Sequence, residues 1–100
     1  MKLFYSYSQF DLDLLNMLET HLSILKRQKI ISTWAYKNIN AGQEWRKIVD
    51  KNLQESDIIL LLISSYFIAS DYCFEYEMQY ALDQHKKGNK LVVSQASKVG

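Results

Sequence analysis

A run of six consecutive apolar residues, Ile58 to Ile63, constrains the fold more than any other feature of the sequence. The run lacks the alternation of apolar and polar residues that a strand with one solvent-facing side shows. A strand of this kind is buried on both faces, as in a parallel sheet that helices cover on each side. The run is also too short to cross a membrane, because a spanning helix needs about 20 apolar residues.

Short β-prone runs predict the other strands of such a sheet. These strands are expected at Leu3–Tyr7, Ile30–Trp34 and Leu91–Val93. Helical periodicity fills the three intervals between the strands, so the predicted order is β-α-β-α-β-α-β. This alternation predicts an α/β fold with a parallel sheet, right-handed crossovers and helices on both faces.

The first two helices are predicted from leucine spacing and from capping signals. Leucines three and four positions apart indicate a helix with Ser8 as its N-cap, reaching about 26–29. Asp11 is placed where it would complete a capping box with Ser8. A second apolar stripe at helical spacing runs from Trp45 to Leu53.

The third helix is predicted to begin at a cap formed by Ser70 or Asp71 and to reach about Lys87. Residues 64–69 before it are expected to be a connection. A rotation of 100° per residue predicts which side chains share the apolar stripe of this helix. They are Phe74, Met78, Ala81, Leu82 and His85.

Composition excludes several classes of protein. The chain is 48% hydrophobic and 23% charged, which is typical of a single globular domain over residues 1–100. Twelve basic and eleven acidic residues leave a net charge of +1, so the balance favours neither nucleic acid nor an anionic membrane as partner. The lone Cys73 cannot form an internal disulfide, and the N-terminus lacks a secretory apolar segment, so we expect a cytoplasmic location.

The sequence offers few of the usual sites of chemistry. Its three glycines cannot form a phosphate-binding loop. His21 and His85 fall in predicted helices without a nearby carboxylate pair, so no metal site is expected. Cys73 could form a nucleophilic pair with a histidine, but a lone helical cysteine is more often a small buried hydrophobe.

Glu77 is the candidate acidic residue of the third helix. Its helical neighbours are Cys73 and Ala81 at four positions and Phe74 and Tyr80 at three, and all of them are apolar or aromatic. A carboxylate in this setting is either partly desolvated, which marks a functional candidate, or is a boundary residue that pairs with a lysine.

Glu75 is the rival acidic residue of this helix. Asp71 and Gln79 lie four positions away on either side of it, so its surroundings are half polar and its carboxylate is expected to be solvated. The two glutamates therefore make opposite predictions about burial.

Ligands of parallel sheets bind where the strands end at their carboxyl termini. That edge is expected near Ser8, residues 36–42 and residues 64–71. Aromatic residues gather there and could stack on a flat ring such as a nucleobase or nicotinamide, or could simply be core and rim residues. They are Tyr5, Tyr7, Trp34, Tyr36, Trp45, Tyr66 and Tyr72.

Four blocks of the sequence resemble Toll/interleukin-1 receptor (TIR) domains of bacterial type. Phe4–Ser8 resembles the opening strand F-I-S-Y-S, and Thr33–Trp45 is similar to the BB loop, although Ala35-Tyr36-Lys37 stands where many relatives have His-Asp-Arg. Ser56–Ser64 resembles the strand A-D-I-I-L-L-L-V-S, and Ala69–Met78 resembles the helix start A-S-D-Y-C…E-M. Together the blocks cover about residues 2–88 in family order.

The resemblance implies a flavodoxin-like three-layer sandwich and one of three functions. Many bacterial and plant members cleave NAD⁺ at the nicotinamide–ribose bond in signalling or defence, and release ADP-ribose or a cyclic isomer. Other members only bind further TIR domains, and the chain could also be an inactive fragment. NAD⁺ would be the substrate, with no separate cofactor, and other TIR domains would be the partners through self-association.

The resemblance also implies roles for particular residues. Glu77 matches the catalytic glutamate, with Glu75 as its rival. The substrate-binding candidates are Tyr7, Ser8, Trp34, Tyr36 and Cys73. The interaction loop would comprise Lys37, Asn38, Ile39, Asn40, Ala41 and Gly42. The fifth strand and last helix of the family are expected to be missing, because residues 94–100 do not resemble their start.

Overall fold

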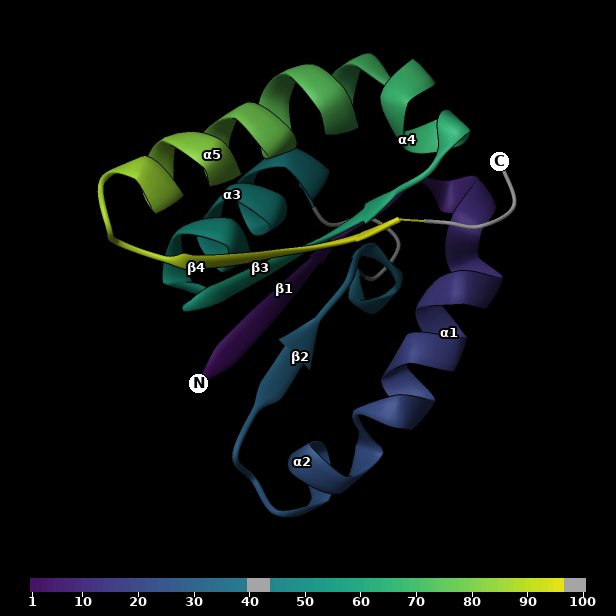
Figure 1. The fold of residues 1–100 in the computed structure, drawn as a ribbon, viewed down its shortest axis with the longest axis vertical. Helices are drawn as coiled ribbons and strands as arrows, with labels where there is room; N and C mark the ends of the chain where they lie inside the picture. The colour runs from purple at the N-terminus through teal and green to yellow at the C-terminus, as the bar shows by residue number, and fades with distance from the viewer. Residues whose placement is uncertain (40–43, 97–100) are drawn as a thin grey trace.

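The computed structural model describes residues 1–39 and 44–96 (Figure 1). Strands and helices alternate along this part of the chain. In chain order the elements are β1 (Lys2–Ser6), η1 (Gln9–Asp11), α1 (Leu12–His21), α2 (Ser23–Arg27), β2 (Ser32–Trp34), η2 (Tyr36–Asn38), α3 (Trp45–Glu55), β3 (Ile58–Ile63), α4 (Ser65–Ala69), η3 (Tyr72–Glu77), α5 (Met78–Lys86) and β4 (Leu91–Ala96).

The strands of the described residues form one parallel sheet in the order β2-β1-β3-β4. Phe4 pairs in register with Trp34 on one side and with Ile59 on the other. β1 and β3 are therefore the central strands, and β2 and β4 lie at the edges. The parallel pairing places the carboxyl ends of all four strands at the same edge of the sheet.

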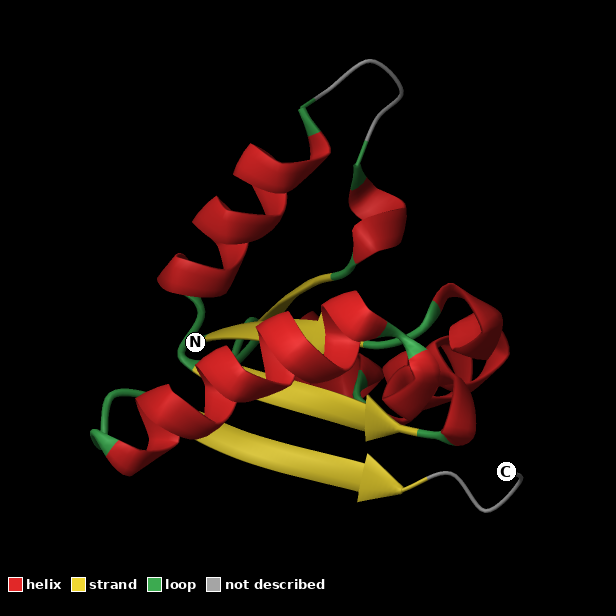
Figure 2. Ribbon diagram, turned by 90° about the horizontal axis from the view of Figure 1, so that it is seen from above, coloured by secondary structure: helices red, strands yellow, loops and turns green. Residues whose placement is uncertain are grey.

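Each face of the sheet carries its own core, which confirms the predicted α/β fold with helices on both sides. Ile59 and Leu61 pack towards α3 and α5, together with Val49 of α3. Leu60 and Leu62 point to the opposite face, where Leu15 of α1 is fully buried. The unbroken apolar run of β3 follows from this arrangement, because consecutive side chains of a strand point to opposite faces and so enter different cores. Figure 2 shows strands of the sheet side by side with helices packed over them.

The start of the chain departs from the predicted single helix. η1, α1 and α2 replace it, and the first α-helix ends at His21. Ser8 is the N-cap of η1, where its hydroxyl accepts a hydrogen bond from the Phe10 amide at 3.3 Å. Asp11 does not complete a capping box. Its buried carboxylate instead accepts a hydrogen bond at 2.5 Å from the hydroxyl of Ser64. Asp11 therefore makes a tertiary contact in place of the predicted local one.

The segment before the third helix is ordered, and the helix itself begins differently from the prediction. The predicted connection contains the short helix α4 over residues 65–69. The chain then passes through the π-helical turn η3 before α5 begins at Met78. The predicted apolar stripe is correct only in part. Ala81 is buried and Met78 packs against the core, but Phe74, Leu82 and His85 are exposed, and Cys73 and Glu77 are the buried residues of η3.

The last strand is longer than the predicted Leu91–Val93. β4 continues through residues 94–96, where no strand was predicted, and it pairs with β3 over its full length. Residues 97–100 lie outside the described part of the chain. Leu91 and Val93 are 55% and 41% exposed, so the outer part of this edge strand presents apolar surface.

The Ser64 hydroxyl connects η1 with α4 through two hydrogen bonds. It donates to Asp11 and caps α4 by accepting the Phe67 amide at 3.1 Å. We predict that Ser64→Ala lowers the free energy of unfolding by about 1–3 kcal/mol, because it removes the cap and leaves the buried Asp11 carboxylate unpaired. Urea unfolding measures the change. Ser65→Ala at the exposed next position is the control, and equal losses in the two variants would contradict the prediction.

Candidate active site

A pocket of about 410 Å³ opens at the carboxyl edge of the sheet, where segments following β1, β2 and β3 meet. Its volume falls within the range typical of small-molecule sites. Aromatic side chains dominate its walls. The lining residues are Tyr7, Ser8, Gln9, Phe10, Tyr36, Trp45, Tyr66, Ala69, Ser70, Tyr72 and Cys73. The pocket thus lies at the edge where parallel sheets bind their ligands.

Glu77 lies behind this pocket at the end of the π turn η3 and is fully buried. Its Oε1 atom accepts two hydrogen bonds, from the Ser6 hydroxyl at 2.5 Å and from the Tyr36 hydroxyl. Ser6 is the last residue of β1, and Tyr36 begins η2 after β2. Three segments distant in sequence therefore converge on one carboxylate. π turns of this kind recur at functional sites in proteins.

The second oxygen of Glu77 is not satisfied in the same way. Among the described residues Oε2 has no hydrogen-bond partner of good geometry, and the buried hydroxyl of Tyr72 also lacks one. The two groups are nevertheless close enough to affect each other, since Glu77 contributes to raising the pKa of Tyr72, after burial. A buried oxygen of this kind is retained in few structures without a reason.

Burial dominates the electrostatics of Glu77. It raises the pKa of the carboxyl from 4.5 to about 7, although the hydroxyls of Ser6, Tyr36 and Tyr72 favour the charged form. The same site raises the pKa of Tyr36, first through burial and then through the nearby Glu77 charge. The glutamate therefore changes its charge close to neutral pH, which is where a catalytic carboxylate is most often tuned.

Tyr36 connects the pocket to the glutamate. Its ring lines the pocket and stacks on Tyr7 with centroids 4.9 Å apart, while its hydroxyl donates to Glu77. Trp45 packs at 6.1 Å from Tyr36 and at 4.8 Å from Tyr72. The aromatic wall thus stands between the open pocket and the carboxylate, and a ligand in the pocket meets these rings before it meets Glu77.

The structure places the predicted substrate-binding residues in two groups. Tyr7, Ser8, Tyr36 and Cys73 line the pocket. Cys73 is buried and donates its thiol to the Tyr7 carbonyl at 3.4 Å, and burial raises the pKa of the thiol, so it behaves as a small core residue. Trp34 does not line the pocket. It stacks on Phe4 in the core at 5.2 Å between ring centroids.

The two candidate glutamates and the predicted interaction-loop residues lie in different environments. Glu75 is exposed, as its polar neighbours indicated, whereas Glu77 is buried. Lys37 and Asn38 line a different pocket beside α1 and α2, and Ile39 packs against the core on the α3 side. The predicted loop residues Asn40, Ala41 and Gly42 lie outside the described part of the chain.

Sequence reasoning missed Ser6 as a site residue. The strand period of two places Ser6 on the same face as Phe4, towards the helix that carries Glu77, so the alternation along β1 held a usable signal. Phe10 and Tyr66 were also missed as a pair. Their rings lie 5.2 Å apart at the pocket, and both are more than half exposed. No short-range pattern links these two residues, which are 56 positions apart.

No helix within residues 1–39 and 44–96 combines the length and apolar character required to cross a membrane. The parallel sheet, its two helical layers and the aromatic pocket at its carboxyl edge define a flavodoxin-like α/β domain. The sequence matches the family model of the TIR domain over residues 3–95. The chain therefore belongs to the TIR domain family, as the four sequence blocks indicated.

One similar protein extends this finding to a longer chain. The sequence is 47% identical over 90 residues to the uncharacterized protein y4lF of Sinorhizobium fredii (strain NBRC 101917 / NGR234). The match covers 90% of this chain but only 28% of that relative. The similarity thus concerns the TIR domain and leaves the rest of the relative unmatched.

Proposed function

We propose that this TIR domain cleaves NAD⁺ at the nicotinamide–ribose bond, as a hydrolase or cyclase in signalling or defence. The observation that carries the proposal is the burial of Glu77 behind an aromatic pocket, and this burial raises the pKa of its carboxyl to about 7. A buried ionisable group reduces stability, and it is most often kept where its charge has a function. Membership of the TIR family supports this reaction class, since the family includes NAD⁺-cleaving members.

The chemistry needs only one carboxylate. When the bond between the ribose C1′ and the nicotinamide nitrogen breaks, its electron pair stays on the nitrogen and neutralises the positive charge of the ring. The leaving group departs neutral, so the acid that protonates the leaving group in most glycosidases is not required. The positive charge left on the ribose is stabilised by the Glu77 carboxylate. Water then bonds to C1′ and loses its proton to solvent, or an adenine nitrogen of the same molecule closes the ring.

The pocket walls fit the remaining parts of such a substrate. Tyr36, Trp45 and Tyr72 offer flat rings on which nicotinamide could stack. Ser8 and Ser70 bring hydroxyl groups to the same pocket, although the Ser8 hydroxyl also caps η1 and the Ser70 hydroxyl accepts the Cys73 amide at 3.3 Å. Both hydroxyls remain able to donate to polar parts of a ligand.

The ribose reaches Glu77 only after Tyr36 moves. In the structure the Tyr36 hydroxyl donates a hydrogen bond to Oε1 of Glu77, and the glutamate has no exposed surface. Activity should therefore depend on the η2 turn that carries Tyr36. Self-association with other TIR domains could supply this change, and the exposed apolar residues Leu91 and Val93 on the edge strand β4 favour such pairing.

The same covering of Glu77 favours a second function. A TIR domain whose glutamate stays covered by Tyr36 would act only as a protein–protein interaction module. In that case the surface around η2 would bind another TIR domain, and no NAD⁺ would be consumed. A direct assay separates the two functions: nicotinamide release from NAD⁺ at high protein concentration or under crowding. Detectable release favours the enzyme, and its absence together with stable self-association favours the module.

The pH dependence of that release is a second expected result. The charged form of Glu77 is the form that stabilises the positive charge on the ribose. The value of kcat/KM should therefore rise with pH through about 7. The ionised fraction of such a group increases about tenfold between pH 6 and pH 8, and kcat/KM should follow it, since this parameter reports the free enzyme. A profile that is flat or falls over this interval would contradict the assigned role of the carboxylate.

A further inference from the structure

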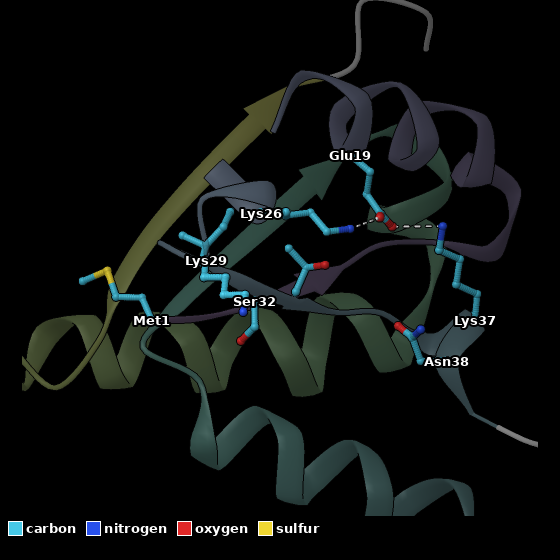
Figure 3. A pocket seen from close by; sticks show the side chains of 9 residues that line it. Met1, Glu19, Lys26, Lys29, Ser32, Lys37 and Asn38 are labelled. Atoms are coloured by element: carbon cyan, nitrogen blue, oxygen red, sulfur yellow. Dashed lines mark hydrogen bonds and ion pairs between the residues drawn. The ribbon is translucent and has the colours of Figure 1, made fainter. Parts of the chain in front are cut away.

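A second pocket, of about 450 Å³, lies away from Glu77, between the first two α-helices and the open edge of β2. Figure 3 shows Lys26 of α2 and Lys37 of η2 pointing toward Glu19 of α1, whereas the side chain of Met1 points away. The residues that line it are Met1, Glu19, Lys26, Lys29, Ile31, Ser32, Thr33, Lys37 and Asn38. Lys37 and Asn38 also belong to the predicted interaction loop, but neither that loop nor the proposed reaction assigns a small ligand to this pocket.

Positive charge predominates in this pocket. Three lysine ammonium groups face one carboxylate, that of Glu19. Glu19 bridges Lys26 at 3.0 Å and Lys37 at 2.9 Å (Figure 3). Burial favours the neutral form of Glu19, but its hydrogen bonds with Lys37 and Lys26 hold the pKa of the carboxyl below its usual range. The carboxylate therefore stays charged at neutral pH and occupies two of the cations.

Lys29 is the lysine of this pocket that Glu19 does not hold. Among the described residues it forms no ion pair, and its backbone adopts a left-handed conformation with φ of 58°. Glycine is favoured in this conformation, and a lysine adopts it at some expense of stability. The conformation fixes where the Lys29 side chain leaves the turn between α2 and β2, which is beside the pocket.

Neutral hydrogen-bond donors complete the lining. Ser32 and Thr33 bring hydroxyls from β2, and Asn38 brings an amide whose oxygen already accepts the Ala35 N–H at 2.9 Å, leaving its NH₂ group as donor. The Ser32 amide donates to the carbonyl of Met1, the residue before β1. Since amides alternate along a strand, the Thr33 amide points to the open edge.

We propose that this pocket binds a phosphate-bearing anion, held by Lys26, Lys29 and Lys37 and by the donors along the edge of β2. The surplus of two positive side-chain charges and the supply of N–H and O–H donors match a multiply charged oxyanion. Glu19 competes with the ligand, because a bound phosphate would pair with Lys26 and Lys37, which now pair with Glu19. The proposal is independent of the NAD⁺ reaction, and its test measures binding alone.

Inorganic pyrophosphate is the probe, titrated calorimetrically into the full chain at low ionic strength. We expect saturable binding that weakens about fivefold or more in Lys29→Gln, which removes the unpaired cation. Glu19→Gln should strengthen binding by a similar factor, because it frees Lys26 and Lys37. The control is Lys51→Gln on α3, an exposed lysine on the other side of the sheet, which has the same change of charge and should leave binding unchanged.

Opposite effects of Lys29→Gln and Glu19→Gln cannot come from a general loss of folding, and thermal unfolding of each variant confirms that it is folded. Equal weakening in Lys29→Gln and Lys51→Gln would overturn the proposal, because it would indicate attraction by net charge alone. Weakening in Glu19→Gln would also overturn it. A parallel titration with vesicles that contain phosphatidic acid assigns the pocket to a lipid phosphate if only these bind, and binding of neither probe rejects it.

Discussion

Glu77→Gln is expected to reduce nicotinamide release from NAD⁺ by about 10²-fold or more. The amide keeps the shape of the side chain and can still accept the hydrogen bonds of Ser6 and Tyr36, so the variant should retain the fold. It loses only the negative charge, which is the part that stabilises the positively charged ribose. The measurement compares initial rates at equal protein concentration and at pH 8, where most of the wild-type carboxyl is ionised.

Glu75→Gln supplies the matched control for this result. Glu75 lies two positions away on the same turn and is exposed, so the substitution makes the same chemical change without touching the buried site. Its rate should stay close to that of the wild type. If Glu75→Gln abolishes release and Glu77→Gln does not, the rival glutamate carries the reaction and the burial argument is wrong.

The second large effect concerns stability rather than rate. Above pH 7 the Glu77→Gln variant is expected to be more stable than the wild type, by up to about 3 kcal/mol in the free energy of unfolding. The reason is that the native protein must hold an ionised carboxylate in a fully buried position, whereas the unfolded chain leaves it in water. Glutamine removes this penalty, because it carries no charge at any pH.

The sign follows from the raised pKa. In the folded state the carboxyl titrates at about 7, whereas its ordinary value is 4.5, so between these pH values the native state binds a proton that the unfolded state has released. The contribution to stability is therefore fully present below pH 4.5 and is lost as the pH rises through about 7. Relative to Glu77→Gln, the wild type should become steadily less stable over this interval.

Urea unfolding of the two proteins at several pH values between 4 and 8 measures this difference without any assay of activity. Glu75→Gln again serves as control and should follow the pH dependence of the wild type. A constant difference between wild type and Glu77→Gln at all pH values would contradict the prediction. Because the readout is stability, this result stands or falls separately from the proposed reaction with NAD⁺.

The two predictions together describe a residue whose charge lowers the stability of the fold. An ionised carboxylate with one oxygen unpaired in the core weakens the fold, and the packing around it would tolerate a neutral side chain. Sites of this kind are where a protein gives up stability for activity. If Glu77→Gln were more stable and no activity were found in the wild type, the burial of this charge would lack a function in catalysis.

Local sequence was sufficient for the architecture. The apolar run of β3 was predicted with its observed bounds, because a strand buried on both faces carries its signature in consecutive residues. The alternation of strands and helices then determined a parallel sheet with two helical layers. The burial of Glu77 and the exposure of Glu75 also followed from local neighbours, since the buried side chains of the helix recur at i, i+4 and i+8.

Local pattern failed where a distant group supplied the partner. Asp11 looked like half of a capping box, but Ser64, 53 positions away, offers a buried hydroxyl instead. The π turn at Tyr72–Glu77 was also out of reach, because helical periodicity assumes a constant rotation per residue and a π turn changes it. Trp34 looked like a pocket residue, but it packs against Phe4 of the neighbouring strand.

The sequence by itself therefore determined the fold class, the family and the acidic residue of the site. Only the tertiary structure brought Ser6 and Tyr36, 71 and 41 positions from Glu77, to the same carboxylate oxygen. It alone also grouped Glu19, Lys26 and Lys37 beside the edge of β2. The spacing of apolar residues along a helix or strand indicates which side chains face the core, because this depends on the local geometry of the element. Which partners meet depends on strand order and register, and these are set by the packing of the whole chain.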